Sequence, residues 1–315
     1  MMNCRIEAIV DEALGIKSFL LKPTDSIKLP AYTAGAHIDV HVNSDIIRQY
    51  SLIKLPELKN QYLIGILKDQ NSRGGSEKIH TEFMVGKEIK ISEPRNLFAL
   101  EEQAEHYILF AGGIGITPIL SMALELHQQQ KSFELHYCLR TLEHAAFKSQ
   151  LLDSPISKYC CIHMDDQPLT KMDLTTILGK SNKQQHIYVC GPSGFIDYIH
   201  RTALENNWSE LQFHKENFSN TVDHSNAQSF ELVLAESNKI FLIPADKSVL
   251  EILLENNLDV DCSCEQGICG SCVLEVIEGE VEHHDQFLTT AEKESNKLFT
   301  PCCSRAKSKQ LVIRL

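Results

Sequence analysis

Long hydrophobic runs and positive charge are both scarce in this sequence. No apolar run in the 315 residues approaches the roughly 20 that a helix needs to cross a bilayer, and the start, MMNCRIEAIV, has a polar centre unlike that of a signal peptide. We therefore expect a cytoplasmic protein that does not engage a membrane. The net charge of -12 argues against nucleic acid as a partner, because phosphate binding needs clustered Lys and Arg, and leaves a basic protein partner possible.

Cysteine, in contrast, is abundant, and the eleven cysteines are not spaced like a disulfide framework. Cys264, Cys269 and Cys272 follow C-x4-C-x2-C, the spacing of plant-type [2Fe-2S] ferredoxins, which also need a distant fourth cysteine. Cys302 follows Cys272 after 29 intervening residues, which matches the ferredoxin spacing. The pattern predicts an iron–sulfur cluster. Zinc, which favours C-x2-C pairs, and free thiols are the alternatives.

Four neighbouring residues bear on this prediction. Gly267 and Gly270 let the backbone curl closely around a cluster and aim N–H groups at its sulfurs. Cys262 lies too near the first ligand to join it, and we expect it to be a small buried residue. Cys303 directly follows Cys302 and could replace it as a ligand, although the spacing favours Cys302.

The chain divides into three predicted domains. Residues 1–102 contain short strand-like runs separated by turns, which predicts a small antiparallel barrel. Residues 103–220 alternate strand and helix, which predicts a parallel sheet with ligands at the carboxyl ends of its strands. Residues 221–229, rich in Asn and Ser, are predicted to be a linker, and residues 230–315 an α+β domain of β-grasp type.

Hydrophobic periodicity predicts the helices and strands of each domain. The barrel strands are 4–12, 17–23, 37–42, 48–53, 62–68 and 86–92. The parallel domain has strands 106–112, 133–140, 158–164, 186–191 and 211–216, and helices 118–129, 173–179 and 192–207. The last domain has two strands in 230–244, a helix over 248–257, a strand in 272–283 and a closing strand over 310–315.

Two strand ends in the predicted parallel sheet are rich in glycine. In AGGIGITP (111–118), Gly113 and Gly115 permit a tight turn into a helix, and Thr117 can cap that helix. The N–H groups of such a turn can bind phosphate. No glycine completes G-x-G-x-x-G, so an ordinary strand–helix turn is the alternative. CGPSG (190–194) ends a second strand in a similar way.

Two stretches of the predicted barrel suggest an anion site. Arg48, in RQYSL (48–52), could pair with a phosphate, and a surface salt bridge is the alternative. RGGS (73–76) precedes a predicted short helix over 77–83, whose N-terminus would offer a second contact.

In their order along the chain, these motifs resemble those of the phthalate dioxygenase reductase family, which includes vanillate O-demethylase and carnitine monooxygenase reductases. The resemblance covers the whole chain and rests on R-x-Y-S, G-G-S, G-G-I-G-I-T-P, C-G-P and the cysteine motif. It implies a flavin barrel, a nicotinamide-nucleotide domain and a plant-type ferredoxin domain in one monomeric chain. It also implies that electrons pass from NADH through FMN and a [2Fe-2S] cluster to a Rieske-type oxygenase.

The resemblance further implies roles for individual residues. The FMN site would comprise Arg48, Tyr50, Ser51, Leu52, Arg73, Gly74, Gly75 and Ser76, with Ser51 near the flavin N5 and Phe218 at the flavin face. The nucleotide site would comprise Gly113, Gly115, Ile116, Thr117, Arg140, Cys190, Gly191 and Pro192. The catalytic residues would be Ser51, Cys190 and Glu216. For Cys190 an ordinary buried cysteine is the alternative, and we expect no nucleophilic role for it.

Some choices stay open at this point. The phosphate-sized RGGS loop favours FMN over FAD, and the isolated Arg140, followed by Glu143, favours NADH over NADPH. An acceptor other than a Rieske oxygenase and a zinc-stabilised adaptor without flavin are the rival functions. Asp259, Asp261 and Glu265 could steer a basic acceptor or form a merely solvated acidic face.

Overall fold

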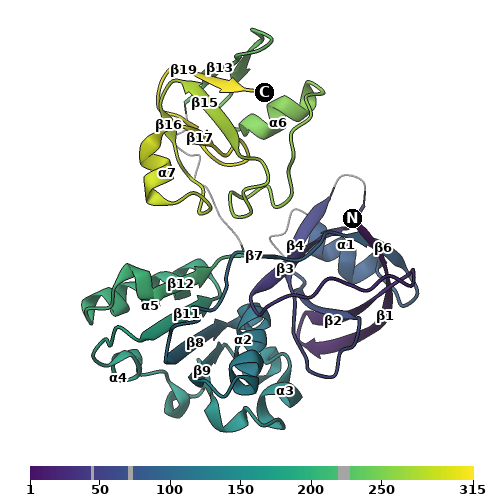
Figure 1. The fold of residues 1–315 in the computed structure, drawn as a ribbon, viewed down its shortest axis with the longest axis vertical. Helices are drawn as coiled ribbons and strands as arrows, with labels where there is room; N and C mark the ends of the chain where they lie inside the picture. Colours follow the sequence, from purple (N-terminus) through teal and green to yellow (C-terminus); the bar gives the residue numbers. More distant parts are fainter. Residues whose placement is uncertain (44–45, 70–73, 219–227) are drawn as a thin grey trace. The chain divides into compact units, whose positions relative to one another are not determined.

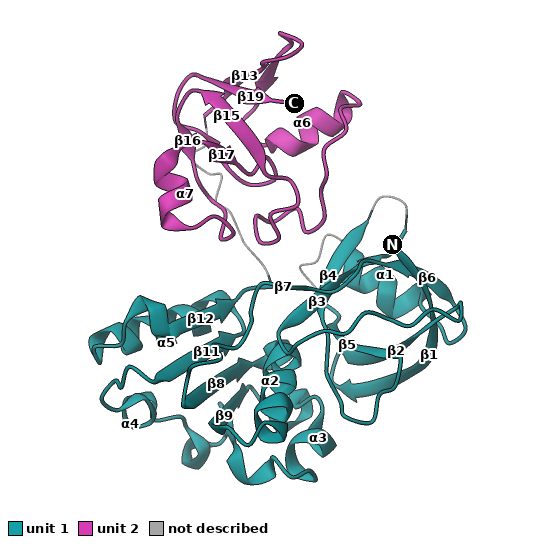
Figure 2. Ribbon diagram, viewed as in Figure 1, with its two compact units in different colours: residues 1–218 teal, residues 219–315 magenta. Residues whose placement is uncertain are grey.

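The chain forms two compact units in the computed structural model, which describes residues 1–43, 46–69, 74–218 and 228–315. The units are Met1–Phe218 and Ser219–Leu315, coloured separately in Figure 2. The predicted linker over 221–229 lies mostly outside the described residues. No helix among the described residues is long and apolar enough to cross a membrane.

A seven-stranded antiparallel sheet forms the first part of unit 1 (Figure 1). Its strands are β1 (Met2–Ala13), β2 (Ile16–Pro23), β3 (Ala36–His41), β4 (Ile47–Ser51), β5 (Tyr62–Leu67), β6 (Glu88–Ile91) and β7 (Arg95–Asn96). Their order is β4-β3-β6-β1-β2-β5, with β7 paired to β3. The two ends of this order meet, because Leu52 bridges Ile64 and the N–H of Ile53 donates to the carbonyl of Leu63 (2.8 Å). The sheet therefore closes into the predicted barrel.

Alternating burial explains the barrel strands. In β6, Ile89 and Ile91 are buried while Glu88 and Lys90 are exposed, as expected for a strand with one face on a core. Helix α1 (Gly75–Glu82) lies against this barrel, and the ring of Phe83 just beyond it packs edge-on against Phe19 at 6.1 Å.

The second part of unit 1 is a five-stranded sheet in which every pairing is parallel. Its order is β10-β9-β8-β11-β12. The strands are β8 (His106–Gly112), β9 (Ser132–Leu139), β10 (Cys160–Met164), β11 (Gln185–Cys190) and β12 (Phe213–Glu216). Successive apolar residues of β8 point to opposite faces, so Leu109 joins the core under α2 (Ile116–Gln128) and Phe110 the core under α5 (Ser193–Glu205). Such two-sided burial is typical of a central parallel strand.

Two short helices complete the parallel domain. Helix α4 (Leu174–Leu178) was predicted, and Asp173 caps it by accepting the N–H of Thr176. Helix α3 (Lys148–Leu152) was not predicted, because its five residues are too few for a helical hydrophobic period to show.

Unit 2 contains a five-stranded sheet, ordered β14-β13-β19-β15-β17. The helices and strands of unit 2 are β13 (Phe230–Leu234), β14 (Ile240–Ile243), α6 (Val249–Glu255), β15 (Leu274–Glu278), β16 (Val281–Glu282), α7 (Thr290–Ser295), β17 (Leu298–Phe299), β18 (Arg305–Ala306) and β19 (Gln310–Arg314). The last strand does not close an edge. It lies in the middle, parallel to β13, with Leu311 and Ile313 fully buried.

Candidate redox centres and their family

The three predicted catalytic residues of unit 1 meet although they are far apart in the sequence. Ser51 ends β4, Cys190 ends β11 and Glu216 ends β12. Cys190 and Glu216 are register partners in adjacent parallel strands. The hydroxyl of Ser51 donates to Glu216 Oε2 at 3.3 Å, across 165 residues of sequence. Closure of the barrel against the carboxyl edge of the sheet therefore builds this group.

Both titratable members of this group are neutral near pH 7. Although solvent reaches part of Glu216, the protein atoms around its carboxyl group raise its pKa to about 8, and the hydrogen bond from Ser51 offsets this only in part. Cys190 is fully buried, and burial, followed by the nearby Glu216, raises the pKa of its thiol well above the usual value. A thiol that stays protonated is a poor nucleophile, so Cys190 is suited to packing rather than to covalent chemistry.

Glycine lets the ends of β8 and β11 touch backbone to backbone. A Cβ placed on Gly115 would lie 2.2 Å from the carbonyl oxygen of Cys190, and one on Gly191 would lie 3.0 Å from Cα of Gly112. Gly113 has a φ of +54°, and a Cβ there would meet nothing within 4 Å. The turn thus places bare backbone at the carboxyl edge of the sheet, where parallel sheets bind ligands.

The prediction that Thr117 caps the following helix is wrong. Gly115 is the N-cap of α2, and no side chain caps the helix. Thr117 is buried in the first helical turn, where its hydroxyl donates to the carbonyl of Ile114 at 3.1 Å. Ile116 is fully buried as well. Both side chains pack inside the protein, so only their backbone could contact a nucleotide.

Three of the remaining predicted site residues, two for the nucleotide and one for the flavin face, lie on the surface near strand ends. Pro192 is the N-cap of α5 and is exposed. Arg140 directly follows β9 and is exposed, and Glu143 lies three residues further on in a 3-10 turn. Phe218 is 39% exposed and ends the described part of unit 1.

The predicted phosphate contacts gather at the start of α1. The side chain of Arg48 packs directly over Gly75. A Cβ on Gly75 would lie only 2.7 Å from Nε of Arg48. Gly74 is the N-cap of α1 with a φ of +86°. Ser76 is buried, and its hydroxyl accepts the N–H of Asp69 at 3.2 Å. A guanidinium beside a helix N-terminus is an arrangement that suits a phosphate.

Three further residues were predicted to contact FMN, namely Tyr50, Leu52 and Arg73. Tyr50 is half-buried, and burial raises the pKa of its phenol. Leu52 is fully buried in the barrel core, and its carbonyl accepts a hydrogen bond from Ser121 at 2.7 Å. Arg73 lies outside the described residues.

The four cysteines of the predicted cluster site form two pairs in unit 2. Sγ of Cys272 lies 3.4 Å from Sγ of Cys302. The thiols of Cys264 and Cys269 hydrogen-bond to each other, which lowers the pKa of Cys269 and raises that of Cys264. Two pairs suit a [2Fe-2S] cluster, in which each of two irons takes two cysteines. Among the residues that the structure describes, no three His, Cys, Asp or Glu side chains are arranged so that they could hold one metal ion.

Backbone N–H groups point at these sulfurs, as a cluster requires. The donors are Gln266 to Cys264 (3.3 Å), Gly267 to Cys302 (3.2 Å) and Ser271 to Cys269 (3.5 Å). Gly267 and Gly270 have φ values of +70° and +72°. A Cβ on Gly267 would lie 2.3 Å from Sγ of Cys303, so only glycine fits there. The donor set and the glycines fit the cluster.

Two nearby cysteines are placed differently. Cys303 is buried, and its sulfur lies 3.5 Å from the hydroxyl of Thr300 and 3.8 Å from that of Ser304. Cys262 is half-buried at the edge of the core rather than fully buried as expected.

Asp285, a buried carboxylate beside the cysteine loop, was not predicted to have a role. It had no signal in the sequence, because a single Asp among polar residues resembles any surface turn.

Comparison with known proteins identifies the family. A family model described as a 2Fe-2S iron-sulfur cluster binding domain matches residues 233–307. Vanillate O-demethylase oxidoreductase of Pseudomonas sp. (strain HR199 / DSM 7063) is 44% identical over the full length of both chains. A solved structure of phthalate dioxygenase reductase is 36% identical, with a TM-score of 0.78, and covers 100% of this chain and 98% of that one. The chain belongs to the phthalate dioxygenase reductase family.

Membership in this family confirms the predicted fold class and the prediction of an oxidoreductase with a C-terminal [2Fe-2S] domain. The structure of an intact type IV self-sufficient cytochrome P450 monooxygenase is a further relative. It is 33% identical with a TM-score of 0.84, and the match covers 100% of this chain but 41% of that one. The same reductase architecture thus forms part of a cytochrome P450 monooxygenase elsewhere.

Proposed function

We propose that this chain is the reductase component of a two-component Rieske non-haem iron oxygenase and passes electrons from NADH through FMN and a [2Fe-2S] cluster to the oxygenase. One observation carries the proposal. The same chain builds the Ser51–Glu216 group at the edge of a parallel sheet and the two cysteine pairs of unit 2. When bound, FMN supplies the conversion between the two electrons of a hydride and the single electrons of the cluster.

The residues of unit 1 bind and orient in this scheme. Arg48 with the Gly74–Ser76 turn holds the flavin phosphate, and the bare backbone around Gly113 and Gly115 holds the nucleotide. Ser51 and the protonated Glu216 hold a proton beside the flavin. The isolated Arg140 with the exposed Glu143 favours NADH over NADPH, because a 2′-phosphate needs clustered positive charge.

In unit 2, Cys264, Cys269, Cys272 and Cys302 hold the cluster. The proposed domains are an FMN barrel over 1–102, an NAD domain over 103–220, a linker over 221–229 and a ferredoxin over 230–315. We further propose that the chain is a cytoplasmic monomer, since that compartment supplies NADH and keeps thiols reduced.

The first test is the visible absorption spectrum of the purified protein, followed by NADH addition without oxygen. Flavin bands and a broad shoulder beyond them should both bleach. Cys269→Ser should lose the shoulder and keep NADH-driven flavin bleaching, whereas the control Cys161→Ser, at an exposed cysteine outside the loop, should keep both. A colourless protein would contradict the proposal and favour the zinc-stabilised adaptor.

A second candidate acceptor is a cytochrome P450, and the match to the self-sufficient monooxygenase favours it. The two acceptors are distinguished by mixing the NADH-reduced protein with a Rieske oxygenase and, separately, with a P450. The faster oxidation of the reduced cluster identifies the class.

A further inference from the structure

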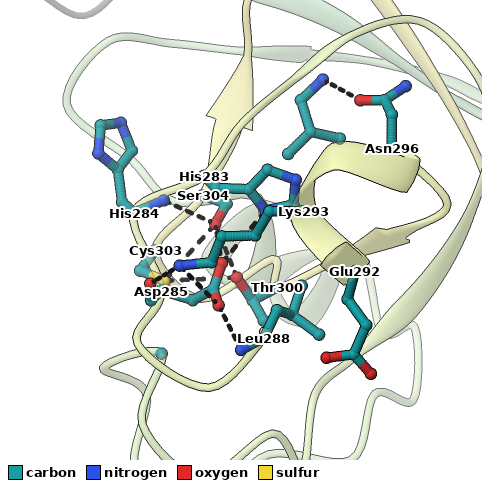
Figure 3. Close-up of polar contacts among 12 residues, drawn as sticks. His283, His284, Asp285, Leu288, Glu292, Lys293, Asn296, Thr300, Cys303 and Ser304 are labelled. Carbon is teal, nitrogen blue, oxygen red and sulfur yellow. Dashed lines mark hydrogen bonds and ion pairs between the residues drawn. The ribbon is translucent and has the colours of Figure 1, made fainter. Parts of the chain in front are cut away.

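A buried carboxylate, Asp285, lies beside the cysteine loop and is given no role in the function proposed above. Asp285 is 4% exposed, and its side chain does not reach solvent. Its Oδ2 accepts the N–H of Leu288 at 2.8 Å, and its Oδ1 accepts the hydroxyl of Ser304 at 3.4 Å. Nδ1 of His283 lies 3.2 Å from Oδ1, and the ammonium of Lys293 lies 3.6 Å from Oδ2. Figure 3 shows these groups converging on Asp285.

This arrangement is costly to bury unless every partner is in place. A carboxylate withdrawn from water needs an opposite charge and hydrogen-bond donors on both oxygens. Lys293 provides the charge and also donates to the backbone carbonyl of Asp285 at 2.5 Å. Because these four groups meet at one carboxylate, a change at Asp285 affects all of them together.

One side of the network reaches the cysteine loop. The N–H of Gln286, the next residue, donates to the carbonyl of Gly267 at 2.9 Å. The N–H of Gly267 in turn donates to Sγ of Cys302 at 3.2 Å. A Cβ on Gly267 would lie 3.0 Å from Cα of Asp285, so the two backbones are in close contact. The backbone at Asp285 and Gln286 is therefore linked to Gly267 by a hydrogen bond and by close packing.

The other side reaches the segment that carries the distant ligand. The hydroxyl of Ser304 lies 2.7 Å from that of Thr300 and accepts the N–H of His284 at 3.1 Å. Thr300 and Ser304 lie on either side of Cys302 in the sequence. Through Ser304, Asp285 is thus bound to the segment over 300–304.

We propose that Asp285 is a positioning residue for the [2Fe-2S] cluster. It joins the cysteine loop to the segment over 300–304 and so fixes the N–H···S bond from Gly267 to Cys302. The inference rests on the proposed function, because it requires that the four cysteines hold a cluster. Hydrogen bonds to cluster sulfurs help set the reduction potential, and they stabilise the more negative, reduced state. Loosening this link should lower the potential and expose the irons.

The test compares three variants of the full chain carrying its cofactors. Ser304→Ala removes one link without changing charge, and Asp285→Asn keeps the shape of the carboxylate but not its charge. Glu292→Gln is the matched control, since Glu292 belongs to the capping box of α7 with Thr289 and is exposed. The measurements are iron release to a chelator, the cluster reduction potential, the EPR spectrum of the reduced cluster and the thermal unfolding curve.

Ser304→Ala is expected to lower the potential and to release iron about tenfold faster, the factor by which loss of a partner outside the ligand set typically weakens metal binding. Asp285→Asn should release iron faster still and shift the EPR spectrum. Its potential is less informative, because the loss of a negative charge raises the potential while the loss of the link lowers it. Glu292→Gln should match the unsubstituted chain in the three cluster measurements.

The proposal is overturned if both Ser304→Ala and Asp285→Asn match Glu292→Gln in iron release and EPR spectrum while only their unfolding curves move. That result would make the network a fold-stabilising one. If Asp285→Asn does not fold, Ser304→Ala decides by the same criteria. An unsubstituted chain that binds no cluster would refute the proposed function itself. A normal cluster with unaffected variants would refute this inference alone.

Discussion

Gly115→Ala tests the close contact between the ends of β8 and β11 most directly. Gly115 has a φ of −60° and a ψ of −7°, so alanine fits its backbone conformation without strain. Its Cβ, however, would lie 2.2 Å from the carbonyl oxygen and 2.4 Å from the carbonyl carbon of Cys190. Ordinary carbon–oxygen contacts are about 3.3 Å, so the two strand ends must separate by about 1 Å.

A displacement of this size acts on two quantities. Forcing extra atoms into a packed site costs about 1–3 kcal/mol of unfolding free energy. A misplacement of about 1 Å in a reacting geometry costs about 100-fold in rate. Cys190 ends the strand beside Glu216, so we expect the rate of flavin reduction by NADH to fall by about that factor. The cluster of unit 2 should still be reduced normally by dithionite.

The assay is anaerobic stopped-flow bleaching of the flavin by NADH, together with urea unfolding. Gly194→Ala is the matched control, because a Cβ there meets nothing within 4 Å and alanine favours the first turn of α5. A Gly115→Ala variant with the same bleaching rate and stability as Gly194→Ala would refute the steric argument.

Two further predictions follow from the sites. The pKa of Glu216 is about 8 in the folded chain, compared with the ordinary value of 4.5. Between these pH values the folded chain therefore keeps a proton on Glu216 that the unfolded chain has lost. Unfolding free energy should therefore fall as pH rises through this window, by up to about 1.4 kcal/mol per pH unit, and urea unfolding of Glu216→Gln should lack this component. Cys302→Ser should lose the cluster iron while Cys303→Ser keeps it, because Cys302 is the one that pairs with Cys272. Iron content measures this, and the reverse pattern would make Cys303 the ligand.

Local pattern was sufficient for most elements of the fold. The strand predicted over 106–112 is β8 residue for residue, because its continuous apolar run is buried on both faces. The helix predicted over 248–257 is α6, where Ser248 and Glu251 form a capping box. Helix α7 was missed because its six residues bury no side chain and so carry no hydrophobic period. The Thr117 cap was wrong because a 3-10 turn over Gly113–Gly115 brings the helix start forward to Ile116.

The cysteine motif and the glycine turns were also readable from the sequence, since cluster ligation and tight turns depend on residue type at short spacing. The contacts between residues far apart in the sequence could not be predicted in this way. That Ser51 meets Glu216, that Cys272 pairs with Cys302, and that a buried Asp285 joins two segments all depend on sheet register and chain packing. These contacts join residues up to 165 positions apart, and no local pattern encodes such distances. Sequence alone determined which chemistry the chain carries, and the tertiary structure decided which groups act together, because only packing brings distant segments into contact.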